Sequence, residues 1–153
     1  MKLRLYQSIV LPTTIYAGVI WKRTAAISNR LDVFHRRCLR TILGISWRDH
    51  ITNEELMKRA GMDDLSDIVT VRRRRFAGHV MRLPKERPAK VAMRWTPAGG
   101  KRKRGRPKTT WRKTFQEYLQ EMGIDWSSAQ SAATDRSRWR ALVARCSNRS
   151  GRN

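Results

Sequence analysis

Apolar residues recur at helical spacing through almost the whole chain, and no stretch alternates as a β-strand would. In the clearest segment, 25–45, apolar side chains return every three or four positions, at Ile27, Leu31, Phe34, Cys38, Ile42 and Ile45. Arg30, Arg37 and Arg40 fall towards the opposite side of that helix. The pattern therefore predicts an amphipathic helix with a basic back, within an all-α fold.

Turn and capping residues divide the rest of the chain into further helices. The segment 3–20 predicts a helix kinked at Pro12, whose nitrogen has no hydrogen to donate. Thr52 and Glu55 form a capping-box pattern, which opens a short helix that ends before Gly61. Further helices are expected at 66–83, at 110–122 and, as one or two helices, at 127–146.

Positive charge is concentrated in the middle of the chain. Between Arg72 and Lys113 there are seventeen Lys and Arg residues against one acid, Glu86, which is +16 of the net +22. Such a field repels itself unless it meets a polyanion, and nucleic acid is the commonest polyanion in a cell. An anionic membrane face or simple solubility would be the alternatives. The apolar run at 9–20 is too short to span a bilayer, so we expect a nucleic-acid partner and no membrane.

Two basic clusters carry the candidate binding residues. Successive helical residues are about 100° apart, so the arginines at 72–75 cannot all lie on one solvated face. At least one must turn inward, where it needs an acid of this domain or a phosphate of a ligand. We favour phosphate contact over a surface run with one snorkelling arginine.

The second cluster is the run at 101–108. It contains Arg104-Gly105-Arg106-Pro107, which resembles the core of an AT-hook, a thin segment that can enter an A·T minor groove. A linker that grips phosphates, or a nuclear localisation patch, would have the same composition. The residues predicted to contact nucleic acid in the two clusters and between them are Arg72, Arg73, Arg74, Arg75, Arg82, Lys101, Arg102, Lys103, Arg104, Arg106 and Lys108.

The remaining chemistry-bearing residues point to no reaction. Trp47 and Trp95 lie beside loops and basic residues, where they could stack on bases or pack internally. The three histidines and two cysteines show no metal-ligand spacing, and no catalytic motif occurs. We therefore expect a protein that is not an enzyme and has no metal or cofactor. Two unpaired cysteines fit a reducing compartment, the nucleus or the cytoplasm.

From Leu5 to Ala144 the chain resembles the C-terminal part of the reverse transcriptase of non-LTR (LINE-type) retrotransposons. The resemblance rests on the order of several motifs, which are Leu5–Val10 with Tyr16 and Trp21, Leu31–Ile45 with Trp47 and Asp49, Thr52–Glu55, Arg73–Leu83, Arg104–Arg112, Asp135–Arg136 and Trp139–Arg140. One departure is the segment from Tyr16 to Trp21, which lacks the Gly and Glu of the family's Tyr-Gly-x-Glu-x-Trp. Another is that the polymerase motifs are missing.

The resemblance implies an architecture and a role. We expect a thumb-like helical bundle at 1–95, a basic linker at 96–108, a C-terminal helical segment at 109–147 and a disordered tail at 148–153. The family's thumb holds the template–primer duplex against the palm. This chain would therefore grip an RNA–DNA duplex, element RNA or target DNA through backbone phosphates, without reading bases.

The palm carries the metal-binding aspartates of the family, so the chain would not polymerise alone. The missing palm would be a second partner, and the sequence would be a truncated or decayed copy of an element. The alternative function is a free-standing AT-hook-type DNA-binding chromatin protein. A third is a protein-interaction bundle whose charge is incidental.

Overall fold

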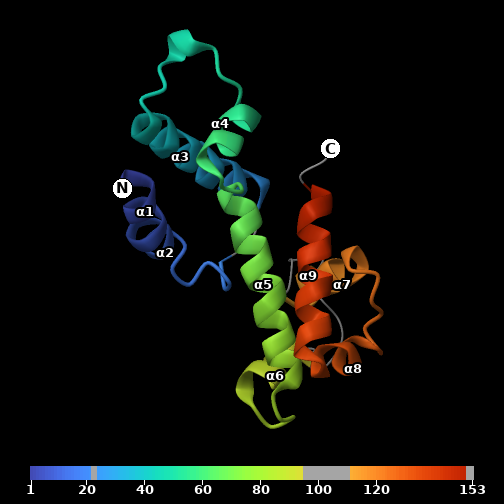
Figure 1. Ribbon diagram of the computed structural model, residues 1–153. Coiled ribbons are helices and arrows are strands. Elements are labelled where there is room, and N and C mark those ends of the chain that lie inside the picture. Colours follow the sequence, from blue (N-terminus) through green and yellow to red (C-terminus); the bar gives the residue numbers. More distant parts are fainter. Residues whose placement is uncertain (22–23, 95–110, 151–153) are drawn as a thin grey trace, which may run out of the picture. The chain divides into compact units, whose positions relative to one another are not determined.

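The structure is a computed structural model that describes residues 1–21, 24–94 and 111–150, with Arg94 and residues 147–150 described by their backbone only (Figure 1). Every regular element in these ranges is a helix, and none of their residues forms a strand, so the predicted all-α fold is confirmed. The α-helices are α1 (Lys2–Leu5), α2 (Leu11–Thr14), α3 (Ala25–Leu43), α4 (Asn53–Ala60), α5 (Leu65–Arg82), α6 (Pro88–Arg94), α7 (Trp111–Glu121), α8 (Ala129–Thr134) and α9 (Arg136–Ser150). In the same ranges, no helix combines the length and apolar character needed to cross a bilayer.

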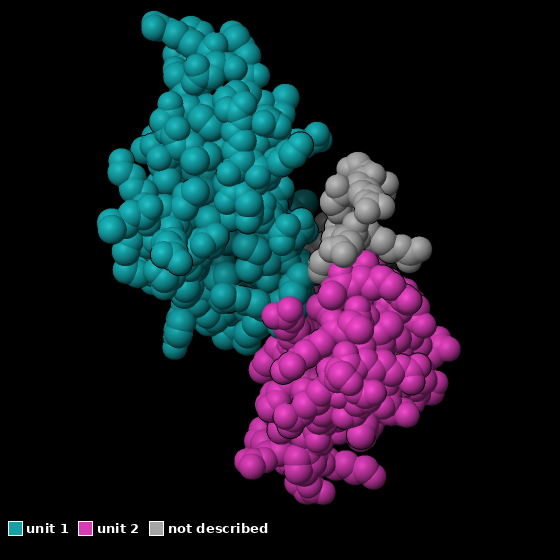
Figure 2. Space-filling model, in the orientation of Figure 1, with its two compact units in different colours: residues 1–73 teal, residues 74–153 magenta. Residues whose placement is uncertain are grey.

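The helices gather into two compact units, unit 1 at residues 1–73 and unit 2 at residues 74–153 (Figure 2). The division falls inside α5, whereas the sequence predicted a first domain extending to residue 95. Residues 74–94 thus belong with the C-terminal helices. The predicted linker at 96–108 lies outside the described residues. Helix α9 continues to Ser150, so the first three residues of the predicted disordered tail at 148–153 are helical, and residues 151–153 also lie outside the described ranges.

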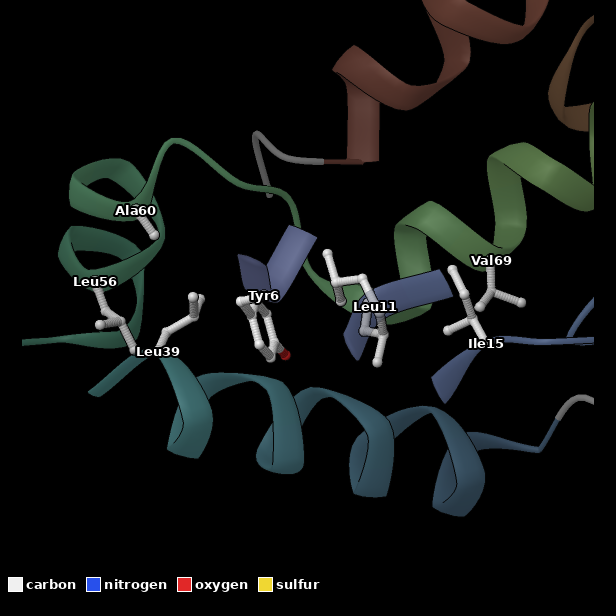
Figure 3. Packing of buried hydrophobic residues seen from close by; sticks show 8 residues of the cluster. Tyr6, Leu11, Ile15, Leu39, Leu56, Ala60 and Val69 are labelled. Atoms are coloured by element: carbon white, nitrogen blue, oxygen red, sulfur yellow. The ribbon is translucent and has the colours of Figure 1, made fainter. Parts of the chain in front are cut away.

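The core of unit 1 is built from four separate stretches of sequence (Figure 3). The N-terminal helical segment, α3, α4 and the first half of α5 each contribute buried apolar side chains, which are Tyr6, Leu11, Ile15, Leu39, Leu56, Ala60, Leu65 and Val69. Full burial of a side chain as large as valine or leucine stabilises a fold by about 1.5–3 kcal/mol. Unit 1 therefore has an apolar core to which only the first half of α5 contributes.

The N-terminal helical segment is shorter than predicted. Helical backbone runs from Lys2 to Thr14 and includes a π-helical turn at Tyr6–Val10, where the Leu11 N–H donates to the Tyr6 carbonyl five residues back. Pro12 lies in the first turn of α2 and cannot donate, which explains the irregular turn that precedes it. Beyond Ile15 the chain forms turns, and Ala17 has a φ of 54°. The predicted helix at 3–20 is therefore wrong in its last third.

Helix α3 begins and ends almost where predicted, and four of the six apolar residues predicted for its core side pack partly buried against the core, namely Leu31, Cys38, Ile42 and Ile45. Thr24 accepts a hydrogen bond from the Ile27 N–H at its start, and Gly44 adopts φ 69° at its end. The fully buried residues are His35 and Leu39, whereas Phe34, expected on the core side, is exposed. His35 is drawn inward because its Nδ1 atom lies 2.7 Å from the Tyr6 hydroxyl, with the two rings stacked.

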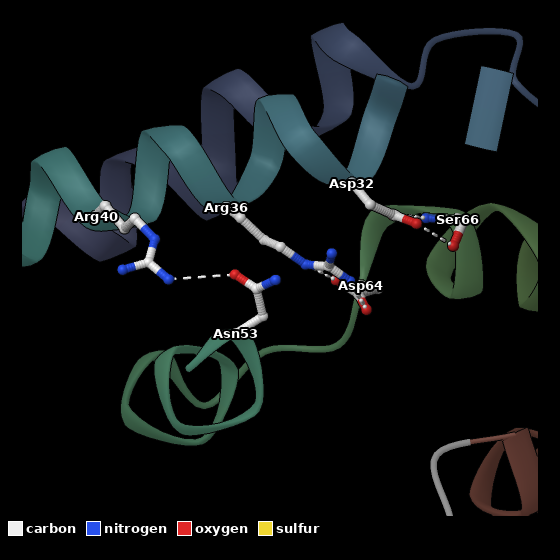
Figure 4. A network of polar contacts seen from close by, with 6 residues as sticks. All are labelled: Asp32, Arg36, Arg40, Asn53, Asp64 and Ser66. Carbon is white, nitrogen blue, oxygen red and sulfur yellow. Dashed lines mark hydrogen bonds and ion pairs between the residues drawn. The ribbon is translucent and has the colours of Figure 1, made fainter. Parts of the chain in front are cut away.

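A row of polar contacts joins α3 to the segments that follow it (Figure 4). The Asp32 carboxylate accepts from the Ser66 N–H and hydroxyl, both at 2.8 Å, and so caps the first turn of α5. Arg36 donates from Nε to Asp64 at 2.9 Å. Side chains of α3 therefore fix where α5 begins, within one residue of the predicted start at 66.

We expect unit 1 to lose stability as the pH falls below about 6.5. Burial lowers the pKa of His35 from its usual value of 6.5, and it outweighs the opposing effects of Asp64, the Asp63 backbone and Asp32. The unfolded chain then binds the proton more readily than the fold does. The free energy of unfolding must therefore decrease with falling pH until His35 is protonated in the folded state as well.

Urea unfolding followed at pH 7.5 and pH 5.0 would measure this loss. The control is His35→Asn, which keeps an acceptor for the Tyr6 hydroxyl but cannot titrate in this range. The variant should lose less stability between the two pH values than the wild type. An equal loss in both proteins would contradict the assignment to His35.

Unit 2 has its own core, formed by the second half of α5 with α6, α7, α8 and α9. Its largest buried side chains include Trp139 of α9, Phe115 of α7 and Met93 of α6. Lys90 is also buried, and its ammonium group donates to the Leu83 carbonyl at 2.7 Å, where α5 has just ended. A cation at that position satisfies carbonyls that a helix C-terminus leaves unpaired. Unit 2 therefore holds a charged helix cap inside its core.

Candidate nucleic-acid interface

The four consecutive arginines of α5 separate into two buried and two exposed side chains. Arg73 is 7% exposed and Arg74 is 4% exposed, whereas Arg72 and Arg75 are exposed. This confirms the prediction that at least one of the four turns inward. Because the unit boundary falls between Arg73 and Arg74, the two buried guanidinium groups lie in different units.

Both buried arginines find partners within the chain. Arg73 donates from Nε to the Gly18 carbonyl at 3.0 Å and also donates to the Trp21 carbonyl. Arg74 forms an ion pair with Glu121 and lies over the Tyr118 ring. Their burial and these partners argue against direct phosphate contact at either residue, and they give both side chains a role in packing.

Four arginines of unit 2, three of them exposed and Arg82 half-buried, lie around a hollow of about 690 Å³, which we call the arginine cleft. Its lining comes from two helices, α5 and α9. The lining residues are Arg75, His79, Arg82, Arg136, Trp139 and Arg140.

Helical spacing explains why these side chains meet. On α5 the residues at 75, 79 and 82 are four and three positions apart, and on α9 the residues at 136 and 140 are four apart. Residues at these spacings lie on one face of a helix. The cleft is therefore lined by one basic face of each helix.

A glycine allows the two helices to approach. The Trp139 indole nitrogen donates to the Arg74 carbonyl at 3.0 Å, and the ring covers Gly78. A Cβ atom added at Gly78 would lie 2.6 Å from Cε2 of Trp139, which is closer than real side chains come. The absence of a side chain at position 78 thus places Trp139 at the floor of the cleft.

The cleft concentrates positive charge, and none of the described residues that line it is an acid. Arg82 donates to the Ala133 carbonyl at 2.9 Å, so its guanidinium is held in place. Burial, and then repulsion from Arg136 and Arg140, lower the pKa of Arg82. Within the described part of the chain, Arg75, Arg136 and Arg140 form no ion pair. Such an arrangement suits an anionic ligand that binds several guanidinium groups at once.

The acid nearest to the cleft in sequence, Asp135, is engaged elsewhere. Its carboxylate accepts from the Ser137 N–H at 2.9 Å, from the Ser137 hydroxyl and from the Arg138 N–H at 3.0 Å. These hydrogen bonds, the Ser137 hydroxyl first, lower the pKa of Asp135. Asp135 therefore caps the start of α9, and it is not among the residues that line the cleft.

The predicted binding residues differ in their exposure and in whether they line the cleft. Arg75 and Arg82 line the cleft, Arg72 is exposed in unit 1, and Arg73 and Arg74 are interior. The remaining predicted residues lie outside the described ranges; they are Lys101, Arg102, Lys103, Arg104, Arg106 and Lys108. The sequence did not single out Arg136 and Arg140, which line the cleft together with Arg75 and Arg82. Their four-residue spacing beside a tryptophan was the available signal.

Comparison with known proteins bears on the origin of the chain. It is 26% identical over 155 residues to an uncharacterized transposon-derived protein of Caenorhabditis elegans, and the match covers 95% of this chain and 54% of that protein. The chain thus spans about half the length of this relative. No family model matches the chain, and no solved structure matches it. The similarity to the nematode protein supports a transposon origin for this chain.

Proposed function

We propose that the chain is a nucleic-acid-binding part of a non-LTR retrotransposon reverse transcriptase, without a polymerase active site. It binds template–primer, element RNA or target DNA through backbone phosphates. The observation that carries this proposal is the arginine cleft, where four guanidinium groups and His79 surround a hollow with no acid among its described lining residues. The transposon origin and the +22 net charge support it.

Phosphate is the ligand chemistry that the cleft suits best. Guanidinium groups donate in a planar fork that matches two phosphate oxygens, and exposed arginines on two helices can hold neighbouring phosphates of one backbone. The Arg82 side chain is already held by its hydrogen bond to the Ala133 carbonyl, so it loses little conformational entropy when a phosphate binds. The contacts would position a strand and would not read its sequence.

The N-terminal segment supports a second part of the proposal, the palm as a protein partner. It exposes several large apolar side chains, which are Leu5, Ile9, Val10, Tyr16 and Ile20. Apolar side chains gathered on one short segment are typical of a surface that packs against another domain. In a reverse transcriptase that domain would be the palm, which carries the catalysis that this chain is not expected to perform alone.

Removing charge from the cleft should weaken binding and its dependence on salt. We expect Arg75→Gln combined with Arg140→Gln to lower the affinity for an RNA–DNA duplex roughly ten-fold at 0.1 M salt, with a slope of log affinity against log salt shallower by about 1.4–1.8. Both residues are exposed, so the fold should survive the change. Fluorescence anisotropy across a salt series would measure both quantities.

The matched control is Arg138→Gln combined with Arg145→Gln, which removes the same charge from exposed positions of α9 outside the cleft. Equal losses in the two double variants would show that the cleft is no special site. No measurable affinity in the wild type at physiological salt would refute the proposed function. A strong preference for A·T-rich duplex that neither double variant changes would favour the AT-hook alternative.

A further inference from the structure

Trp47 projects from unit 1 on the short connection between α3 and α4, and its side chain is 78% exposed. It opens a 3-10 turn at Trp47–Asp49. An indole ring this exposed contributes little to a core, and a single ring is too small an apolar surface for a protein–protein interface. The exposure is therefore a feature that packing does not explain.

The turn that carries Trp47 is held by its own hydrogen bonds. The Ser46 hydroxyl accepts from the Arg48 N–H at 3.4 Å, and the Ser46 N–H donates to the Asp49 carboxylate at 2.6 Å, which completes a capping box. His50 follows with a φ of 48°, in a backbone region uncommon for residues other than glycine. These constraints hold the backbone of the turn from which the indole ring projects.

A second set of contacts ties this connection to the helices on either side. Arg40 of α3 donates to the Ile51 carbonyl at 2.8 Å and to the Asn53 side chain at 3.2 Å, where α4 begins. Gly44 ends α3 in the left-handed conformation, with hydrogen bonds to the carbonyls of Arg40 and Thr41. Trp47 is thus displayed by an anchored connection, and a ligand would not have to order that connection on binding.

The chemistry around the ring favours a nucleotide. The Arg48 guanidinium lies 5.4 Å from the centroid of the Trp47 ring, and Arg48 and His50 are both exposed donors. The one acid in the turn, Asp49, accepts a hydrogen bond from the Ser46 N–H. An aromatic platform beside exposed hydrogen-bond donors such as the Arg48 guanidinium is the combination that binds unpaired bases, because the ring stacks on the base and the donors contact the phosphate.

We propose that Trp47 stacks on an unpaired base of single-stranded RNA or DNA, with Arg48 and His50 contacting the adjoining phosphate. This inference rests on the proposed function, and it adds a site in unit 1 that distinguishes unpaired from paired strands. A base inside a duplex has no free face to offer, whereas a single strand or an overhang does. The arginine cleft, in contrast, binds phosphates of either form.

The test compares Trp47→Ala with the wild type on a twelve-nucleotide single strand and on the blunt duplex of the same sequence. We expect the variant to bind the single strand at least about five-fold more weakly, and the duplex with an affinity within about two-fold of the wild type. Trp47→Phe keeps a ring and should retain most of the affinity. In the wild type, 2-aminopurine placed in the single strand should be quenched on binding, and Trp47→Ala should reduce that quenching.

Phe34→Ala is the control, because Phe34 is an exposed aromatic residue of unit 1 that belongs to no proposed binding surface. It should leave both affinities unchanged. Unchanged single-strand affinity in Trp47→Ala, or an equal loss on single strand and duplex, overturns the stacking role. The stacking role is also overturned if Trp47→Ala binds anionic vesicles more weakly than the wild type but keeps its affinity for the single strand. The proposed function would still hold after these results if the Arg75 and Arg140 substitutions weaken duplex binding. It fails, independently of Trp47, if the wild type binds neither the single strand nor the duplex.

Discussion

Replacing Trp139 with alanine is expected to lower the free energy of unfolding of unit 2 by about 3–5 kcal/mol, the usual cost of truncating a buried tryptophan. The ring is 2% exposed, and it lies against Gly78 of α5. Truncation would also leave the Arg74 carbonyl without the donor that now pairs with it. The same ring forms part of the lining of the arginine cleft, so the cleft should lose its shape together with the stability.

Gly78→Ala tests the contact between α5 and the Trp139 ring, because the direction of the change in the free energy of unfolding depends on that contact. In an ordinary helix interior, alanine is more favourable than glycine by about 1 kcal/mol. Here the added Cβ would meet the Trp139 ring, and overpacking of this kind costs about 1–3 kcal/mol. We therefore expect destabilisation where helix propensity alone predicts a gain.

Chemical denaturation and hydrogen exchange of α9 would measure both variants. Trp47→Ala is the control for loss of a tryptophan, because that side chain is mostly exposed, and it should change stability by less than about 0.5 kcal/mol. A stabilising Gly78→Ala, or a Trp139→Ala that unfolds like the wild type, would show that α9 does not pack on α5 as described.

Arg73→Met should destabilise unit 1 by roughly 3 kcal/mol, an effect larger than any surface charge change in the chain. Hydrogen bonds to a charged donor contribute about 1.5–3 kcal/mol each, and Arg73 makes two, to the Gly18 and Trp21 carbonyls. These bonds hold the turns that follow Ile15 to α5. Methionine fills similar volume but leaves buried acceptors unpaired.

The adjacent Arg72 provides the control. Its side chain is exposed, so Arg72→Met should change the free energy of unfolding by less than about 0.5 kcal/mol. Denaturation curves of the two variants under identical conditions would separate the predictions. If both variants lose the same small amount, Arg73 is not the anchor that its contacts indicate.

Local signals were enough to locate several helices from the sequence. Thr52, predicted to open α4, accepts from the Glu55 N–H, and Gly61, predicted to follow its end, adopts a φ of 62°. These residues act on the backbone within a turn or two, so their effect does not depend on the rest of the fold. Even so, Glu55 pairs with Arg59 instead of completing the predicted capping box.

Side-chain placement on the helices was harder to predict, because it depends on neighbours distant in sequence. His35 takes the interior position expected for Phe34 since Tyr6, twenty-nine residues earlier, bonds to it. For a similar reason, the sequence singled out only two of the four arginines that line the cleft. Arg75 and Arg82 stood out within a dense basic run, whereas Arg136 joins them only because α9 packs against Gly78.

The cap of α5 has a consequence for the order in which the chain folds. Its acceptor, Asp32, belongs to α3 and precedes Ser66 by thirty-four residues. A peptide of α5 alone would therefore lack this cap, and its first turn would begin with an unpaired amide. In a chain made from its N-terminus, α3 is complete before α5 emerges, so the acceptor is already present. Helix initiation and docking onto α3 then become one cooperative event at this point of the fold.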